Sequence, residues 1–386
     1  MNIELKNNKP KERESGIEPL KIIAIFIIVI SHVVQTLGGN TLTPLYTGYS
    51  SFIINYSVCT QDTTTLIICL LQYLGAIGNA IFFICSAWFL VESNKFSPKK
   101  LLSIILDVWF ISVIILFVVH FVMKKEISRD IMLWSCFPTT FANNWYVTCY
   151  VLFYPIHPLL NNWINKLSQQ SLLKVVIVLN ILYVICNFLW SGLYYESPLT
   201  LWIAIYFTIA YIKKYMKKTA NSVKINAILL ICATLCNTGV VVLTNYLGLH
   251  TDYFAGNLLK WYKNNNPLLI LIAICSFNLF RQLHFKNGII NNISKLTLFI
   301  YVIHENLIIR TYGRGYMWEY IYENYGYKHI LIWIMLCSTG IFIGAFILSF
   351  IYSKTIQRFS NWIQKYLYVL ILKIYKIIEK IIYKFD

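Results

Sequence analysis

Apolar runs of about 17 to 25 residues recur along most of this chain and constrain its fold more than any other feature. A helix needs about 20 apolar residues to cross a membrane, because each residue advances it by about 1.5 Å and the hydrocarbon core is about 30 Å thick. The sequence therefore predicts an all-α, polytopic integral membrane protein with about ten transmembrane helices. The spans that we expect cover residues 19–37, 65–91, 101–123, 143–160, 172–193, 199–216, 225–247, 267–283, 289–310 and 329–352.

Charge and composition agree with this class and exclude others. Hydrophobic residues make up 58% of the chain, charged residues 13%, and the mean hydropathy is +0.61, which leaves no sizeable soluble domain. When the predicted spans alternate from a cytosolic N-terminus, most of the 33 Lys and Arg lie on the cytosolic side, so we expect both termini to be cytoplasmic. The basic residues lie between hydrophobic spans rather than on a folded basic face, so we expect no nucleic acid partner. The ten cysteines form no CxxC and no Cys/His cluster with ligand spacing, so we expect no metal site.

The chain divides into three predicted parts. Residues 1–18 form a cytosolic N-terminal tail, residues 19–352 form the membrane domain, and residues 353–386 form a basic amphipathic C-terminal helix. The interleaved basic and apolar residues of that last segment suit a helix that lies on an anionic inner leaflet, with membrane lipid as its partner. The external loop at about 38–64 has no Lys or Arg and is rich in Gly, Thr, Ser and Tyr. It is either a surface that binds a sugar or an ordinary hydrated loop.

Two ionisable side chains, Lys21 and His32, lie within the first apolar run, PLKIIAIFIIVISHVV. At about 100° and 1.5 Å per residue, their spacing puts them on one helix face about three turns apart. Ionisable groups in lipid cost a few kcal/mol or more, so this pair indicates a function or a partner. His32 is either the base of a reaction or a hydrogen-bonded structural residue. Lys21 is either a ligand contact or an interfacial anchor whose ammonium reaches the headgroups, and Glu18 can pair with it in either case.

A second polar group lies on the ninth predicted span. Tyr301 and His304 are three residues apart on one helix face, Glu305 follows the imidazole, and Arg310 lies nearer the outer edge. This group is either part of a pocket for an acceptor or a network that packs helices together.

Other candidates have equally plain alternatives. Ser86, at the end of a Phe-rich run, either contributes to a substrate site or bonds a helix carbonyl. Trp145 and Tyr146 open the fourth span at the outer interface, where they either stack on a sugar or belong to an aromatic belt. His157, between two prolines, is expected to cap freed carbonyls, and Asp107 is a candidate pore-lining group.

Four segments, in this order, resemble motifs of the membrane-bound acyltransferase-3 family, in its branch acting on exopolysaccharides and capsules. In GIEPLKIIAIFIIVISHVV, a basic residue and a histidine are separated by ten positions, and GAIGNAIFFICSAWFLV resembles the glycine-led second span. The segments NNWYVTCYVLFYPIHPLLN and SKLTLFIYVIHENLIIR resemble those of the fourth span and of the late span with Tyr-x-x-His. Two positions depart from the family pattern. Lys21 replaces the usual Arg and cannot make a bidentate phosphate contact, and Ala87 replaces a Gly where the first two spans pack.

The resemblance implies an O-acetyltransferase that moves an acyl group from cytosolic acyl-CoA, usually acetyl-CoA, to a hydroxyl of a surface or lipid-linked polysaccharide. It implies no bound cofactor, and a bacterial plasma membrane as the location. Histidine is the side chain suited to take the hydroxyl proton near neutral pH, so His32 is the predicted catalytic base. Lys21 is the predicted acyl-CoA contact. The predicted substrate or pore-lining residues are Ser86, Trp145, Tyr146, Tyr301, His304 and Glu305.

A secondary transporter or a lipid-linked sugar flippase is the alternative, because its spans would also carry buried polar groups. Against it, the sequence has no clear internal repeat and no matching pair of spans interrupted by Gly or Pro. A glycan polymerase would need a large external loop with several basic residues, and the longest predicted external loop has none. Release of CoA from acetyl-CoA by membranes distinguishes an acyltransferase from the other classes.

Overall fold

The computed structural model describes residues 15–37, 59–190, 197–251, 254 and 258–382, and every regular element in these residues is helical. Most of the external loop expected at 38–64 and most of the N-terminal tail lie outside the described residues. The elements are α1 (Glu18–Leu37), α2 (Thr63–Gln72), α3 (Leu74–Leu90), α4 (Pro98–Phe117), η3 (Val118–Val122), α5 (Arg129–Cys136), α6 (Trp145–Lys166), α7 (Gln169–Asn180), η4 (Ile181–Cys186), α8 (Asn187–Leu189), α9 (Pro198–Tyr215), α10 (Lys217–Ala220), α11 (Val223–His250), η5 (Leu258–Tyr262), α12 (Pro267–Phe280), α13 (Gly288–Lys295), α14 (Thr297–His304), η6 (Ile309–Arg314), α15 (Gly315–Tyr325), α16 (Ile330–Lys354) and α17 (Ile356–Ile382).

Six of the described helical stretches are long and apolar enough to cross a membrane, which supports an integral membrane protein. These stretches are Glu18–Leu37, Thr63–Leu90, Pro98–Val122, Gln169–Leu189, Val223–His250 and Ile330–Lys354. The other four predicted spans correspond to α6, α9, α12 and the interrupted pair α13–α14, which do not meet the same length and hydropathy criteria. The total of ten spans therefore stays a prediction.

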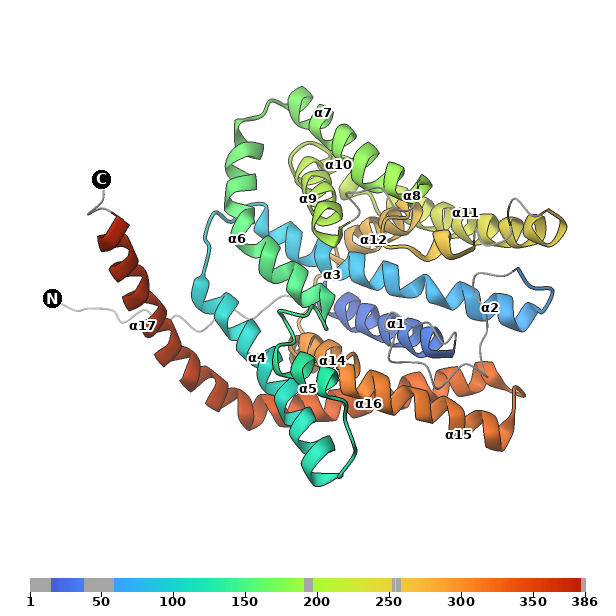
Figure 1. Cartoon of the computed structure of the whole chain (residues 1–386). Coiled ribbons are helices and arrows are strands. Elements are labelled where there is room, and N and C mark those ends of the chain that lie inside the picture. Colours follow the sequence, from blue (N-terminus) through green and yellow to red (C-terminus); the bar gives the residue numbers. More distant parts are fainter. Residues whose placement is uncertain (1–14, 38–58, 191–196, 252–253, 255–257, 383–386) are drawn as a thin grey trace.

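Helix α1 lies in the middle of the molecule, between α3 on one side and α14 and α16 on the other (Figure 1). Small residues of α3 let it approach α1 closely. A Cβ on Gly75 would lie 2.5 Å from Ser31 Oγ, and one on Gly78 would lie 2.5 Å from Ile28 Cγ1 and 2.7 Å from the Ala24 carbonyl oxygen. Ala87, the family departure, is fully buried in the same helix. The close contact fixes α1, and with it the residues that it carries.

Helix α6 contains Pro155 and Pro158 and nevertheless continues to Lys166. A proline at position 158 has no N–H for the carbonyl of Tyr154, four residues earlier. The His157 ring donates a hydrogen bond from Nδ1 to this carbonyl, and His157 is fully buried. The prediction that His157 caps a freed carbonyl is confirmed.

A buried carboxylate is one of the contacts between the C-terminal helix α17 and the membrane domain, beside a Phe110–Phe359 ring contact and a hydrogen bond from Gln364 to the Lys99 carbonyl. Asp107 of α4 accepts hydrogen bonds from the hydroxyl of Tyr352 at 2.7 Å, from Ser360 Oγ at 3.0 Å and from Gln357 Nε2 at 3.4 Å. Asp107 is thus a link between α4, α16 and α17 and does not line the cavity next to α4. That α17 rests on the inner leaflet stays a prediction.

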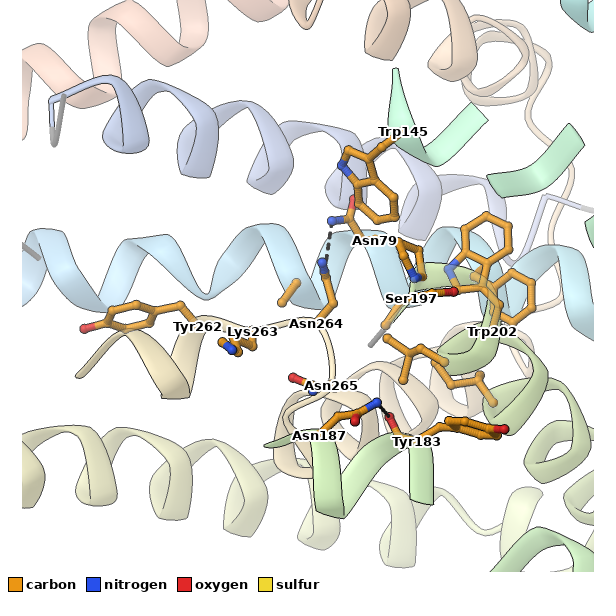
Figure 2. Close-up of a pocket in the computed structure, with 16 residues that line it drawn as sticks. Asn79, Trp145, Tyr183, Asn187, Ser197, Trp202, Tyr262, Lys263, Asn264 and Asn265 are labelled. Carbon is orange, nitrogen blue, oxygen red and sulfur yellow. Dashed lines mark hydrogen bonds between the residues drawn. The ribbon is translucent and has the colours of Figure 1, made fainter. Parts of the chain in front are cut away.

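Two cavities lie along α3 and position the candidate site. The inner cavity, of about 360 Å³, lies between α1, α3, α4, α6 and the pair α13–α14, on the side where α1 begins. The outer cavity, of about 220 Å³, lies between α3, the start of α6, the segment η4–α8, the start of α9 and the residues that precede α12 (Figure 2). Asn79 of α3 lines both cavities, so the two meet at this residue.

Candidate functional site

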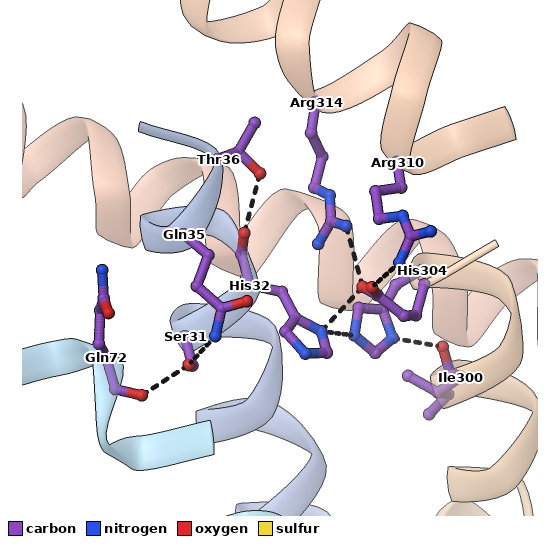
Figure 3. A network of polar contacts seen from close by, with 10 residues as sticks. Ser31, His32, Gln35, Thr36, Gln72, Ile300, His304, Arg310 and Arg314 are labelled. Atoms are coloured by element: carbon purple, nitrogen blue, oxygen red, sulfur yellow. Dashed lines mark hydrogen bonds and ion pairs between the residues drawn. The ribbon is translucent and has the colours of Figure 1, made fainter. Parts of the chain in front are cut away.

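His32 of α1 lies against the end of α14, a contact that the sequence did not predict. The Nδ1 atom of His32 lies 2.9 Å from Glu305 Oε2 and 3.1 Å from His304 Nε2 (Figure 3). The two imidazole rings stack with centroids 5.3 Å apart. His304 and Glu305 are buried, and the His32 side chain keeps 11% of its surface exposed. Of the polar group that the sequence predicted at Tyr301, His304 and Glu305, the last two residues thus contact His32 directly.

The hydrogen bonds determine which nitrogen of each ring carries a proton. His304 Nδ1 lies 2.8 Å from the carbonyl oxygen of Ile300, which can only accept, so Nδ1 is protonated and Nε2 of a neutral His304 is an acceptor. His32 Nδ1 faces this acceptor and a carboxylate, so Nδ1 of His32 carries a proton too. In a neutral His32 the lone pair is therefore on Nε2. Figure 3 shows Nε2 on the opposite edge of the ring, away from His304, Arg310 and Arg314.

Two arginines hold Glu305 as a carboxylate. Arg314 Nη2 lies 2.9 Å from Oε2 and Arg310 Nη1 lies 3.1 Å from Oε1. Both arginines belong to η6 and lie one helical turn apart. Helix α14 ends at His304, and the Asn306 side chain accepts the backbone N–H of Ile308 at 3.0 Å where the chain turns toward η6. Arg314 was missed by the sequence analysis because it follows the predicted span. Its signal was its spacing of four residues from Arg310.

The backbone around His32 is also fixed from several sides. Ser31 donates a hydrogen bond to the Gln72 carbonyl at 2.8 Å, and Gln35 Nε2 donates to Ser31 Oγ at 3.2 Å. The indole N–H of Trp318 donates to the Val33 carbonyl at 3.0 Å. These contacts hold one turn of α1 against α2 and α15, so the imidazole has a defined orientation.

Potential metal ligands coincide with this network. Ligand atoms of His32, His304 and Glu305 lie within 4.8 Å of one another. The two guanidinium groups on Glu305 oppose a further cation there, and His304 Nδ1 is already bonded to a carbonyl. The donor set is therefore better suited to proton transfer than to holding a metal ion.

The inner cavity extends from the start of α1 to Ile28, and His32 is not among its lining residues. Lys21 and Ile28 line it from α1, and His32 lies one turn beyond Ile28 on the same side of the helix. Lys100 of α4 lines the cavity with Lys21, so two ammonium groups border it. Lys100 was missed because a lysine at the cytosolic end of a span is expected for topology alone.

Lys21 does not extend freely to the headgroups. Its Nζ lies 3.2 Å from Glu18 Oε2, and the Ser294 hydroxyl donates to the same carboxylate oxygen. This ion pair, which the sequence predicted, ties the first turn of α1 to α13. Lys21 thus lies at the cavity wall with an exposed fraction of 18%.

The remaining predicted residues separate into two groups. Ser86, Tyr146 and Tyr301 line the inner cavity, and the Tyr146 and Tyr301 rings are 5.8 Å apart. Trp145 lines the outer cavity instead. Since α3 runs antiparallel to α1, with Gly75 facing Ser31, Ser86 lies near the level of Lys21 and far from His32. A Ser86–His32 pair for a covalent acyl-serine therefore has no geometric support.

The family model of the acyltransferase 3 family, described as an acyltransferase domain, matches residues 14–353. This chain belongs to the acyltransferase 3 family. Membership implies a transferase with an acyl donor and an acceptor. The match includes α1 to α16 except the last residue of α16, and therefore the whole His32 network and both cavities. No curated protein and no solved structure matches the chain.

Proposed function

We propose that this acyltransferase 3 protein moves an acetyl group from cytosolic acetyl-CoA to a hydroxyl of a surface or lipid-linked polysaccharide, with His32 as the general base. The observation that carries the proposal is the orientation of His32, whose Nδ1–H faces Glu305 while Nε2 is turned away from its partners. A base of this kind needs one nitrogen free to take a proton and a carboxylate on the other side to stabilise the imidazolium that forms.

The proposed chemistry is a direct acyl transfer. The acceptor hydroxyl oxygen attacks the thioester carbonyl carbon while His32 Nε2 takes the hydroxyl proton. The C–S bond then breaks, an oxygen ester remains on the glycan, and the proton passes from His32 to the leaving thiolate to give CoA. Glu305, held by Arg310 and Arg314, keeps its negative charge beside the imidazolium throughout.

The inner cavity suits the donor. Most of its lining is apolar, with Phe82, Ile104 and Leu298, and Ser86, Tyr146 and Tyr301 add hydroxyl groups for the amides of the pantetheine arm. Lys21 and Lys100 supply positive charge for the CoA phosphates at the end where α1 begins, and Tyr146 and Tyr301 border the other end. Ser86 lines the route of the arm rather than the reacting centre.

The test uses membranes from a bacterium that express either the native chain or His32→Ala at equal levels. Both are supplied with acetyl-CoA labelled in the acetyl group, and base-labile label is measured in glycan. We expect label with the native chain and a loss of about 100-fold or more with the variant, the scale of a general base. Label retained by His32→Ala would make His32 a structural residue.

The transporter and flippase alternative gives a different result in the same experiment. A transporter releases no CoA thiol from acetyl-CoA, whereas the proposed reaction releases one CoA for each ester formed. If the native chain gives no label in glycan and releases no CoA, acetyl-CoA is rejected as the donor. Another acyl donor, or transport, is then favoured.

A further inference from the structure

The outer cavity carries a set of side chains that the proposed chemistry does not use. Carboxamides reach it from three separate parts of the chain, with Asn79 on α3, Asn187 on α8, and Asn264 and Asn265 before α12 (Figure 2). Its lining also includes Ser197, the indoles of Trp145 and Trp202, and the rings of Phe83, Tyr183 and Tyr262. In the described part of the chain, the lining includes one cation, Lys263, and no carboxylate.

Two adjacent asparagines show that this lining is not merely structural. Asn266 caps α12, because its Oδ1 accepts the Leu268 N–H at 2.9 Å while its Nδ2 donates to Asn237 and to the Trp261 carbonyl. Asn265 is 5% exposed, and neither its amide nitrogen nor its amide oxygen has a hydrogen-bond partner among the described residues. A buried amide without partners destabilises a fold unless a ligand or water in the cavity beside it supplies the missing hydrogen bonds.

Asn187 of α8 lines the same cavity (Figure 2). It is 3% exposed, and the hydrogen bond that it makes, from Nδ2 to the Tyr183 carbonyl, is long at 3.4 Å. Its Oδ1 has no partner in the described ranges. Two amides thus present unused donors and acceptors to one cavity.

We propose that the outer cavity binds the acceptor and takes a neutral glycosyl unit. This inference rests on the proposed function. A carboxamide places an N–H donor and a carbonyl acceptor side by side, which matches neighbouring hydroxyls of a pyranose. An indole face packs on the C–H face of a sugar ring, and Trp145 provides one indole, whereas Trp202 is 3% exposed and already stacks on Phe83. Among the described residues, no lining carboxylate is present to bind a cationic sugar, and four amides against the single cation Lys263 offer more partners to hydroxyls than to an anionic group.

The position of the cavity fits an acceptor site. It meets the inner cavity at Asn79, whose Nδ2 donates to Asn264 Oδ1 at 3.1 Å. Trp202 of the outer cavity packs edge-on against Tyr146 of the inner cavity, with ring centroids 4.7 Å apart. A donor in the inner cavity and an acceptor in the outer cavity would therefore meet at Asn79, the residue that both cavities share.

The main variant is Asn265→Leu in the full-length protein, with Asn187→Ala as a second variant that does not depend on the first one folding. Asn180→Ala is the matched control, because Asn180 lies on α7, donates to Val176 and Thr208 at 2.8 Å, and does not line the cavity. Each purified protein is assayed for acetyl transfer at varied acceptor concentration and for slow CoA release without acceptor.

We expect Asn265→Leu and Asn187→Ala each to raise the acceptor KM about tenfold or more, with the acetyl-CoA KM and the acceptor-independent CoA release unchanged. Because the Asn265 amide has no partner among the residues that the structure describes, Asn265→Leu should also keep or raise the thermal midpoint. A structural role for Asn265 predicts the reverse, a lower midpoint with an unchanged acceptor KM, and that result would overturn the proposal.

A binding measurement without acetyl-CoA separates this inference from the proposed function. Neutral methyl hexosides and methyl glucuronide are titrated against native protein and Asn265→Leu. Binding of a neutral hexoside that weakens in the variant supports the cavity assignment even if the native chain releases no CoA, in which case the proposed function alone fails. A preference for the glucuronide, or equal binding by both proteins, overturns the assignment.

Discussion

At the residue scale, the two nitrogens of the His32 ring lie in different environments. Nδ1 faces two acceptors, the Glu305 carboxylate at 2.9 Å and the His304 ring at 3.1 Å, while Nε2 is turned away from both. The carboxylate carries a full negative charge and stabilises a protonated His32, whereas neutral His304 supplies only a lone pair. The two neighbours of His32 therefore contribute unequally to the proposed reaction.

This inequality gives a prediction for two near-isosteric variants. Glu305→Gln keeps the shape but removes the charge, so we expect kcat to fall about 100-fold or more while the acetyl-CoA KM changes little. His304→Phe removes the second acceptor and leaves Glu305 in place, so we expect a loss of about tenfold or less. The comparison uses steady-state kinetics at equal amounts of folded protein.

Thermal unfolding must accompany these kinetics, because Glu305→Gln removes the charge that Arg310 and Arg314 contact. A larger loss of kcat in His304→Phe than in Glu305→Gln, at matched folded fractions, would reject the assignment of Glu305 as the group that stabilises the imidazolium.

At the element scale, the register of α1 against α3 determines where His32 lies. Gly75 and Gly78 leave no room for a Cβ beside Ser31, Ile28 and the Ala24 carbonyl, and a backbone carbonyl cannot rotate away as a side chain can. The motif that the sequence analysis matched at Gly78 therefore has a structural explanation in close helix packing, as small residues provide between membrane helices.

Gly78→Ala should consequently separate α1 from α3. We expect a loss of about 1–3 kcal/mol of unfolding free energy, seen as a lower thermal midpoint in detergent, together with reduced transfer. Gly344→Ala in α16 is the matched control, because a Cβ there would meet nothing within 4 Å. The control should be neutral or gain up to about 1 kcal/mol from helix propensity. Equal midpoints for the two variants would show that α1 and α3 adjust freely.

At the scale of the whole molecule, the sequence predicted the long helices better than the contacts between them. Each long apolar run has a helical counterpart, because span length is a local property of the sequence. Short α5 and α15 were missed, since they lack that length. The contact between His32 and His304 joins residues 272 positions apart, which no local pattern encodes. Likewise, Asn266 directly precedes Pro267, as the cap of a helix often does, but no sequence pattern indicates that the Asn265 amide beside it is buried without a partner among the described residues.

Orientation in the membrane decides which cavity can receive a cytosolic donor. Glu92 lies at the end of α3 near the start of α1, and its contact with Lys213 at 3.0 Å puts the exposed Lys217 on that same side. Lys328 lies on the opposite side, next to Tyr327, whose hydroxyl is 3.0 Å from Thr65 Oγ1 at the start of α2. The proposed donor route requires the side that carries Glu92 and Lys217 to face the cytosol.

Cysteine labelling tests this orientation with Lys217→Cys and Lys328→Cys, made in a background where the exposed Cys232 and Cys236 are replaced by Ser. A membrane-impermeant thiol reagent should label Lys328→Cys in intact cells and Lys217→Cys only after lysis, because the basic side of α3, α9 and α10 is expected in the cytosol. The background protein alone reports labelling of the other native cysteines. The reverse pattern would mean that the end of the inner cavity with Lys21 and Lys100 faces the outside, where no cytosolic acetyl-CoA could reach it. That result would reject the proposed donor site and leave the family assignment intact.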